Sequence, residues 1–208
     1  MFAATMPIEI QCLTRNFLND PVKIEVAPPS TTVDKVVQRV LFVDRINKGA
    51  LLQSMLQNIS IERVLVFART KHGANRIATR LTNSGIPSAA IHGNKSQGAR
   101  TRALSEFKDG TVNVLVATDI AARGIDIAQL PVVVNLDLPN TAADYVHRIG
   151  RTGRAGASGQ AWSLVSADEL QQLKDIETLI QKLLPRETLS GFEPDLKLAE
   201  TTLSAPKK

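Results

Sequence analysis

Residues 112–119, Val-Asn-Val-Leu-Val-Ala-Thr-Asp, join a short valine-rich run to two polar side chains, and this combination indicates the fold. The run at 112–117 is too short for a typical helix and is rich in β-branched residues, as in a strand buried on both faces of a sheet. Comparable apolar runs that predict strands lie at residues 64–68, 89–92 and 132–136, with further candidates at 36–43 and 161–166.

Helical patterns lie between these apolar runs. Apolar residues recur there at the three- and four-residue spacing of a helix that covers a sheet. The positions are Leu52, Met55, Leu56 and Ile59, then Ala74, Ile77, Ala78 and Leu81. Because strands and helices alternate along the chain, we expect an α/β fold, in which a parallel sheet carries helices on both faces.

A last helix is expected after the final strand. Ser166 and Glu169 have the spacing of a capping pair that starts a helix, and a helix rarely continues into a residue such as Pro185. The apolar face of this helix is predicted to be Leu173, Ile176, Ile180 and Leu183.

Composition places the chain among ordinary globular proteins, with 208 residues, 43% hydrophobic and 22% charged. The 25 Lys and Arg against 20 Asp and Glu leave a formal charge of +5, which suits an anionic partner. The single cysteine, Cys12, excludes a disulfide framework or a cysteine-rich zinc site. No apolar run approaches the roughly 18 residues of a membrane span, and no signal-peptide pattern is present, so we expect a cytoplasmic protein without a membrane partner.

Polar and basic residues follow four of the predicted strands. These strand ends are Arg69-Thr70-Lys71, His92-Gly93-Asn94-Lys95, Thr118-Asp119 and Asp137-Leu138-Pro139-Asn140. In an open α/β sheet, ligands bind outside the carboxyl ends of the strands, so the four segments predict a site for a phosphate-bearing ligand along one edge. The alternative is that these residues are polar only because loops lie on the surface.

The most basic segment is residues 147–156, His-Arg-Ile-Gly-Arg-Thr-Gly-Arg-Ala-Gly. Thr141 and Asp144 predict a helix start, which would place His147, Arg151 and Arg154 on one helical face. Arginine keeps its charge and its planar fork matches phosphate oxygens, so these residues predict a polyphosphate partner. A solvated basic helix end, favoured by the helix dipole, is the alternative.

Several of these segments resemble motifs of DEAD-box RNA helicases. Residues 114–126 resemble the fifth motif of that family, 147–154 the sixth and 64–70 the fourth, and residues 97–100 after His92 resemble its Gln-x-x-Arg element. The resemblance covers about residues 30–185. It implies a RecA-like fold and identifies the chain as the second lobe of a bacterial-type ATP-dependent RNA helicase, whose first lobe is expected to be absent from the sequence.

The resemblance assigns roles around ATP. It implies that Arg151 and Arg154 are arginine fingers, catalytic groups that reach the γ-phosphate of ATP bound mainly to the first lobe. Gly124 would let the backbone approach the nucleotide, and Asp126 would accept a hydrogen bond from the ribose. ATP is therefore the implied cofactor, with Mg²⁺ expected only through the first lobe and no metal ligand in this chain.

Three neighbouring residues are implied to have structural or interlobe roles. Asp119 and Arg148 are expected to pair with each other and so hold the basic segment in place. His147 is expected to relay contacts between the lobes rather than to transfer protons, because phosphoryl transfer of this kind leaves little acid–base chemistry to the second lobe.

The resemblance also implies an RNA-binding surface. The residues that match backbone-binding positions of the family are Gly93, Gln97, Arg100, Thr118, Arg123 and Gly124. None of them is an aromatic residue that could stack on a base, so we expect RNA to bind without sequence preference. The N-terminus of the helix after Ser96 would add backbone donors for a phosphate.

Other helicase parts are missing from the 208 residues. The sequence has neither a Gly-x-x-x-x-Gly-Lys-Ser/Thr phosphate loop nor an Asp-Glu-Ala-Asp run, so the chain alone is expected not to hydrolyse ATP and to need a first lobe as its partner. A non-catalytic nucleic-acid-binding or interaction module with the same fold is the alternative. A third hypothesis, less favoured than these two, is a related ATP-dependent motor protein that acts on DNA.

The resemblance divides the chain into four parts. Residues 1–26 would be the end of the first lobe, with a helix carrying Ile10, Leu13 and Phe17 and a strand at 22–26. The remaining parts would be an interlobe linker at 27–35, the helicase C-terminal domain at 36–185 and a loose extension at 186–208. Because residues 1–26 would lack their usual partner, we expect them to be mobile, to pack back irregularly or to drive self-association through their apolar face.

Overall fold

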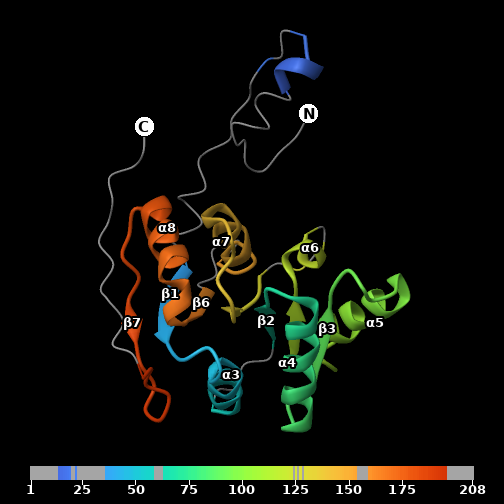
Figure 1. The fold of residues 1–208 in the computed structure, drawn as a ribbon. Coiled ribbons are helices and arrows are strands. Elements are labelled where there is room, and N and C mark those ends of the chain that lie inside the picture. Colours follow the sequence, from blue (N-terminus) through green and yellow to red (C-terminus); the bar gives the residue numbers. More distant parts are fainter. Residues whose placement is uncertain are drawn as a thin grey trace.

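The structure is a computed structural model, and it describes residues 14–19, 22, 36–58, 63–123, 125, 127, 129–153 and 159–195. Within these residues, one parallel sheet is flanked by helices (Figure 1). The α/β fold predicted from the alternating pattern is therefore confirmed.

The sheet has seven strands in the described part of the chain, hydrogen-bonded in the order β3-β4-β2-β5-β6-β1-β7, and all neighbouring strands run parallel. Their bounds are β1 Val36–Phe42, β2 Val64–Phe67, β3 Ser88–Ile91, β4 Val114–Ala117, β5 Val132–Asn135, β6 Gly159–Val165 and β7 Arg186–Glu187. The six predicted strands are all present, and β7 is an addition.

The three neighbouring strands β4, β2 and β5 are buried at every position. Their valines lie in register, with Val64 paired to Val114 on one side and to Val132 on the other. Continuous burial requires that both faces of the sheet be covered, which is why these strands have apolar runs instead of an alternating pattern.

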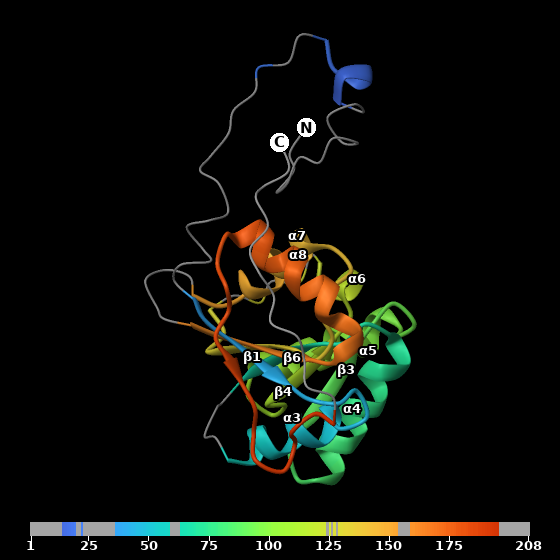
Figure 2. The same cartoon turned by 60° about the vertical axis from the view of Figure 1, so that its left-hand side comes forward.

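The helices are α3 Lys48–Gln57, α4 Lys71–Asn83, α5 Gln97–Lys108, α6 Asp119–Ala122, α7 Ala142–Ile149 and α8 Leu170–Ile180. Helices α3 and α4 pack on one face, where Leu52 and Leu81 belong to the same buried core cluster as Trp162 of β6. Helices α5 and α6 pack on the other face in one cluster, and α7 and α8 pack there in a second. Figure 2 shows α7 and α8 on the side of the sheet opposite to α3.

Helix α8 ends earlier than predicted. The Ser166–Glu169 capping box is present, and Leu173 and Ile176 are buried against the sheet as expected. The helix stops at Ile180 because the chain turns into the left-handed region at residue 181, with φ of 53°. The expectation that Leu183 faces the core is therefore wrong: it is 44% exposed, and Leu184 is buried instead.

Part of the expected loose C-terminal segment packs on the domain. Residues 186 and 187 form β7 beside β1, and the amide of Val40 donates to the carbonyl of Pro185 at 2.8 Å. Phe192 contacts the core cluster under α3 and α4. Residues 196–208 lie outside the described residues.

Most of the predicted first-lobe segment lies outside the described residues, including Ile10, Leu13 and positions 23–26. Residues 14–17 are helical and Phe17 is exposed. Self-association through residues 1–26 stays a prediction. Ile59, the last apolar position expected in α3, also lies outside the described residues. In the part of the chain that the structure describes, no helix is long and apolar enough to span a membrane.

Candidate functional site

The polar residues that follow β2, β3, β4 and β5 lie at one edge of the sheet, as predicted. The amide of Arg69, after β2, donates to the carboxylate of Asp137, after β5, at 2.9 Å. The amide of Thr118, after β4, donates to the carbonyl of Ile91, at the end of β3, at 3.3 Å. The parallel order of the strands brings these ends together, so one edge presents the candidate ligand-binding residues.

A pocket at this edge collects most of the basic residues that the sequence analysis selected. It lies between the end of β2, helix α6, helix α7 and the turn after α7. Its lining residues are Phe67, Asp119, Ala122, Arg123, Asp144, His147, Arg148 and Arg151. We call it the arginine pocket. Because segments from four parts of the chain form it, its shape depends on the packing of the whole edge.

Helix α7 starts as predicted but ends sooner. The Thr141 side chain accepts a hydrogen bond from the amide of Asp144 at 3.3 Å, which caps the helix. The helix ends at Ile149, and Gly150 is its C-cap residue. The prediction that His147 and Arg151 share a helical face is therefore wrong, although both line the arginine pocket. Arg154, the third residue of that predicted face, lies outside the described residues.

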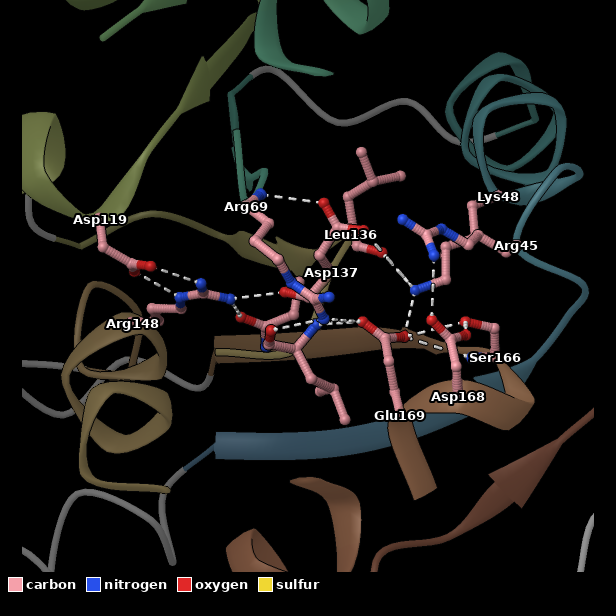
Figure 3. A network of polar contacts seen from close by, with 12 residues as sticks. Arg45, Lys48, Arg69, Asp119, Leu136, Asp137, Arg148, Ser166, Asp168 and Glu169 are labelled. Atoms are coloured by element: carbon pink, nitrogen blue, oxygen red, sulfur yellow. Dashed lines mark hydrogen bonds and ion pairs between the residues drawn. The ribbon is translucent and has the colours of Figure 1, made fainter. Parts of the chain in front are cut away.

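Arg148 is locked into the edge of the sheet (Figure 3). Its guanidinium forms two hydrogen bonds of 2.7 Å with the carboxylate of Asp119, the residue that the sequence analysis paired with it. It also donates to the Asp137 carbonyl at 2.7 Å and lies over the Phe67 ring at 4.9 Å. Because its side chain is only 2% exposed and its guanidinium is engaged by these partners, Arg148 connects α7 to α6 and to the end of β5 and is not available to a ligand.

Arg151 lies in the turn after α7. Its guanidinium donates to the carbonyls of Ile125 at 3.1 Å and Ala122 at 3.4 Å, which hold it against the end of α6. Its own carbonyl accepts from the amide of Leu130 at 3.1 Å. The next residue, Thr152, is fully buried and its hydroxyl donates to the Leu130 carbonyl. These contacts attach the turn at residues 150–153, which we call the arginine turn, to the segment before β5.

Arg123 and Asp144 form an ion pair of 2.6 Å at the mouth of the arginine pocket. Burial alone would raise the pKa of Asp144, but hydrogen bonds from Thr141 and Arg123 and the positive charge of Arg123 lower it below its usual value. The structure therefore places Arg123 at the same pocket as Arg151, although the sequence analysis expected it to bind RNA.

The remaining RNA candidates lie beside β3 and β4. Helix α5 begins after Ser96, whose side chain accepts from the amide of Ala99 at 3.3 Å. Gln97 and Arg100 are in its first turn and contact each other at 3.3 Å, and Gly93 has open space where a Cβ would lie. Thr118 precedes α6 and contributes no side-chain cap to it. Gly124 and Asp126 lie outside the described residues.

His92 lies at this edge in one of the four predicted strand ends, but the sequence analysis assigned it no role of its own. Its Nε2 lies 3.0 Å from the side-chain oxygen of Asn75, and its Nδ1 is buried without a partner in the described chain. Burial and the positive charges of Lys95 and Lys71 lower the pKa of His92. The buried contact of His92 with Asn75 was not predictable, because no local pattern links the two residues.

A second group missed by the sequence analysis is an ion-pair network next to Arg148 (Figure 3). The buried carboxylate of Glu169 contacts both Lys48 and Arg69, the latter at 2.7 Å. Lys48 also donates to the Leu136 carbonyl at 2.9 Å. Sequence analysis placed Glu169 only in a helix cap, because its other partners come from distant parts of the chain. No cluster of potential metal ligands is found among the described residues.

Comparison with known proteins gives the family. Residues 47–156 match the model of the helicase conserved C-terminal domain. The chain is 38% identical over 186 residues to the DEAD-box ATP-dependent RNA helicase 30 of Arabidopsis thaliana. The aligned region covers 88% of this chain and 31% of that protein. It is also 38% identical over 187 residues to the ATP-dependent rRNA helicase RRP3 of Scheffersomyces stipitis, covering 90% and 39%. The chain thus spans about a third of the length of these curated relatives.

Solved structures agree with this result. The fold matches the E. coli DEAD-box protein SrmB, crystallised with the regulator RraA, with a TM-score of 0.74, 36% identity and coverage of 79% of this chain and 98% of that one. It matches S. cerevisiae Dbp5 bound to RNA and ADP BeF3 with a TM-score of 0.80, 28% identity and coverage of 90% and 50%. The sheet with its flanking helices is thus a RecA-like fold, and it corresponds to the helicase C-terminal domain. The chain belongs to the DEAD-box RNA helicase family.

Proposed function

We propose that this chain completes the ATP site and part of the RNA-binding surface of an ATP-dependent RNA helicase. The observation that carries the proposal is the arginine pocket, where His147, Arg123 and Arg151 meet at the carboxyl edge of the sheet. Arginine side chains grouped at such an edge suit the phosphates of a nucleotide. The pocket holds about 250 Å³ of empty space, less than the roughly 300–1,000 Å³ of a complete ligand pocket, which suits a nucleotide whose other contacts come from a first lobe.

Arg151 is proposed to be an arginine finger, together with Arg154 from the segment outside the described residues. Two of its described contacts are with neutral carbonyl oxygens. A phosphate oxygen is a stronger acceptor than a carbonyl, so the guanidinium gains by exchanging these contacts for the γ-phosphate. A cation placed there stabilises the charge that spreads over the transferred phosphoryl group.

The neighbouring residues support this role without touching the reacting atoms. The paired hydrogen bonds between Arg148 and Asp119 hold the start of residues 148–151, which we call the arginine segment. His147 lines the pocket and is proposed to contact the first lobe. Gly124 and Asp126 are proposed to approach the nucleotide and its ribose.

RNA is proposed to bind along the ends of β3 and β4 through its sugar–phosphate backbone. Gln97 and Arg100 lie in the first turn of α5, where free backbone amides favour a phosphate. Gly93 leaves room for the RNA, and Thr118 and Arg123 lie at the end of β4 and at α6. Dbp5, which this chain resembles in fold, was crystallised with RNA.

The two-lobe arrangement sets what the chain does alone. ATP and Mg²⁺ are proposed to bind mainly through the first lobe, because the phosphate-loop motif is absent from this sequence. The isolated chain is therefore proposed to be inactive in ATP hydrolysis.

The test is Arg151→Ala in this chain joined to a first lobe from a DEAD-box relative. RNA-stimulated ATP turnover is expected to fall by about 10³- to 10⁵-fold, the effect of losing an arginine finger in phosphoryl transfer. Arg39→Ala is the matched control, because Arg39 lies on β1 and pairs with Glu187 at 3.8 Å. Turnover of the control is expected to equal that of the parent enzyme.

Unchanged turnover in Arg151→Ala would contradict the finger assignment. If, in addition, the parent protein bound RNA but showed no ATP turnover when joined to a first lobe, the chain would be a non-catalytic binding module. Comparing RNA with DNA at matched salt separates an RNA-dependent enzyme from a DNA motor, since much of the affinity for either is electrostatic.

A further inference from the structure

Glu169 is a buried carboxylate beside the arginine pocket that contacts three other segments of the chain without lining the pocket. It is 2% exposed. One oxygen accepts from the Arg69 guanidinium at 2.7 Å and from the amide of Leu138 at 3.0 Å. The other contacts Lys48 and accepts from the amide of Ser166 at 3.3 Å. A charge buried to this extent is costly unless it is paired, so these partners determine where α8 meets the edge of the sheet.

The turn at residues 136–138, directly after β5, is held from two sides (Figure 3). On one side Lys48 donates to the carbonyl of Leu136 at 2.9 Å, and Glu169 accepts from the amide of Leu138. On the other side Arg148 donates to the carbonyl of Asp137 at 2.7 Å. Consecutive backbone groups of this turn thus connect the Glu169 pair with the start of the arginine segment.

The charges in this network balance. Its cations are Lys48, Arg69 and Arg148, and its carboxylates are Asp119, Asp137 and Glu169. The carboxylate of Asp137 lies 3.9 Å from the Lys48 ammonium and accepts from the amide of Arg69. Without the charge of Glu169, Lys48 is drawn toward Asp137, because a buried ammonium retains a strong need for a carboxylate. That shift pulls on the residue whose carbonyl anchors Arg148.

We infer that Glu169 is a positioning residue for the arginine segment 148–151. Its charge, acting through Lys48 and the 136–138 turn, sets the place from which Arg151 reaches the nucleotide. The inference rests on the proposed function of Arg151 and extends it to a residue at the start of α8 that does not line the arginine pocket.

The first test is Glu169→Gln, which keeps the shape and the hydrogen-bonding oxygen but removes the charge. In this chain joined to a first lobe, kcat is expected to fall by about 10- to 100-fold, the usual effect of a small displacement of a catalytic group. KM for ATP is expected to change little, because the displaced arginine acts on charge that develops in the transition state.

Glu177→Gln is the matched control. Glu177 is likewise a buried glutamate, but it lies within α8, whereas Glu169 directly precedes that helix. It is 1% exposed and accepts from Arg186 and from the amide of Leu184. These partners lie toward the other end of the helix. The control is expected to lose stability as Glu169→Gln does but to keep the kcat of the parent enzyme.

A second variant tests the role of charge. Lys48→Met combined with Glu169→Gln removes one cation and one anion, so the network is balanced again. The double variant is expected to recover most of the lost kcat, whereas a purely structural loss would grow with the second substitution. In the chain without a first lobe, the Nε–H signal of Arg148 in nuclear magnetic resonance spectra is expected to shift in Glu169→Gln and to return toward its parent position in the double variant.

Equal kcat in Glu169→Gln and Glu177→Gln, with an unmoved Arg148 signal, would overturn the inference while leaving the proposed role of Arg151 intact. Full turnover in Arg151→Ala would instead overturn the proposed function. The Arg148 signal would then still report whether Glu169 sets the arginine segment, so the two failures are distinguishable.

Discussion

Gly159 shows how one residue sets the arginine turn. It is the first residue of β6, and a Cβ there would overlap the side chain of Thr152 and lie 2.5 Å from the backbone nitrogen of Gly153. A backbone atom cannot move aside as a flexible side chain can. The absence of a side chain at this position therefore allows the turn after Arg151 to pack against the sheet.

Gly159→Ala is expected to lower the free energy of unfolding by about 1–3 kcal/mol, the usual cost of forcing extra volume into a packed site. Gly98→Ala is the matched control, because a Cβ at that helical position would meet no described atom within 4 Å apart from its chain neighbours and the backbone of its own helix. Alanine there is expected to stabilise the chain by about 0.5–1 kcal/mol through its better helix propensity. Urea titration measures both, and equal stabilities would contradict the steric argument.

His92 predicts a dependence of stability on pH. Its pKa is lowered in the folded chain from an ordinary value of 6.5, by burial first and then by Lys95 and Lys71. As the pH falls below this value, the unfolded chain binds a proton that the folded chain does not, so the free energy of unfolding decreases until the folded pKa is reached.

The measurement is urea denaturation of the parent and of His92→Gln between about pH 7.5 and 5, on either side of the ordinary histidine pKa. The variant is expected to lose less stability over this range than the parent does. Parallel curves for the two proteins would show that His92 does not contribute.

Helix α8 shows how a single element divides between core and surface. Leu173 is fully buried with α7 against β1 and β6, whereas Leu179 is 52% exposed on the opposite side of the same helix. The same residue type in the same element therefore has two different environments, and burial alone separates them.

Leu173→Ala is expected to lower the free energy of unfolding by about 2–5 kcal/mol, because it removes buried contacts and leaves a cavity. Leu179→Ala, as the control, is expected to change it by at most about 0.5 kcal/mol. Thermal and urea unfolding compare the two variants. A similar loss in both would mean that α8 does not pack on the sheet as described.

The elements differ in how far the sequence predicts them. The buried strands β2, β4 and β5 were predictable, because a short run of β-branched valines favours a strand that is buried on both faces. The two residues of β7 carry no such pattern, and they become a strand only because β1 presents a free edge beside them. The end of α7 at Ile149 was missed because the charge pattern continues past the helix.

At the scale of the molecule, the edge that carries the candidate site followed from the order of strands and polar residues. The roles of Arg151 and its neighbours followed from the family resemblance and stay proposals. The Lys48–Glu169 pair was not predictable, because the two residues are 121 positions apart in the sequence. They meet only in the folded sheet, where β5 and β6 lie between β1 and β2. Contacts of this kind depend on topology and leave no local pattern.

The position of β1 in the sheet has a consequence for how the protein is made. Its two hydrogen-bonded neighbours, β6 and β7, begin at Gly159 and Arg186, more than a hundred residues later. While the ribosome is still adding the residues between them, β1 has been synthesised but has no strand to pair with. The apolar side chains of Val36, Val40 and Leu41 therefore need shielding, by chaperones or by transient collapse, until β6 and β7 emerge.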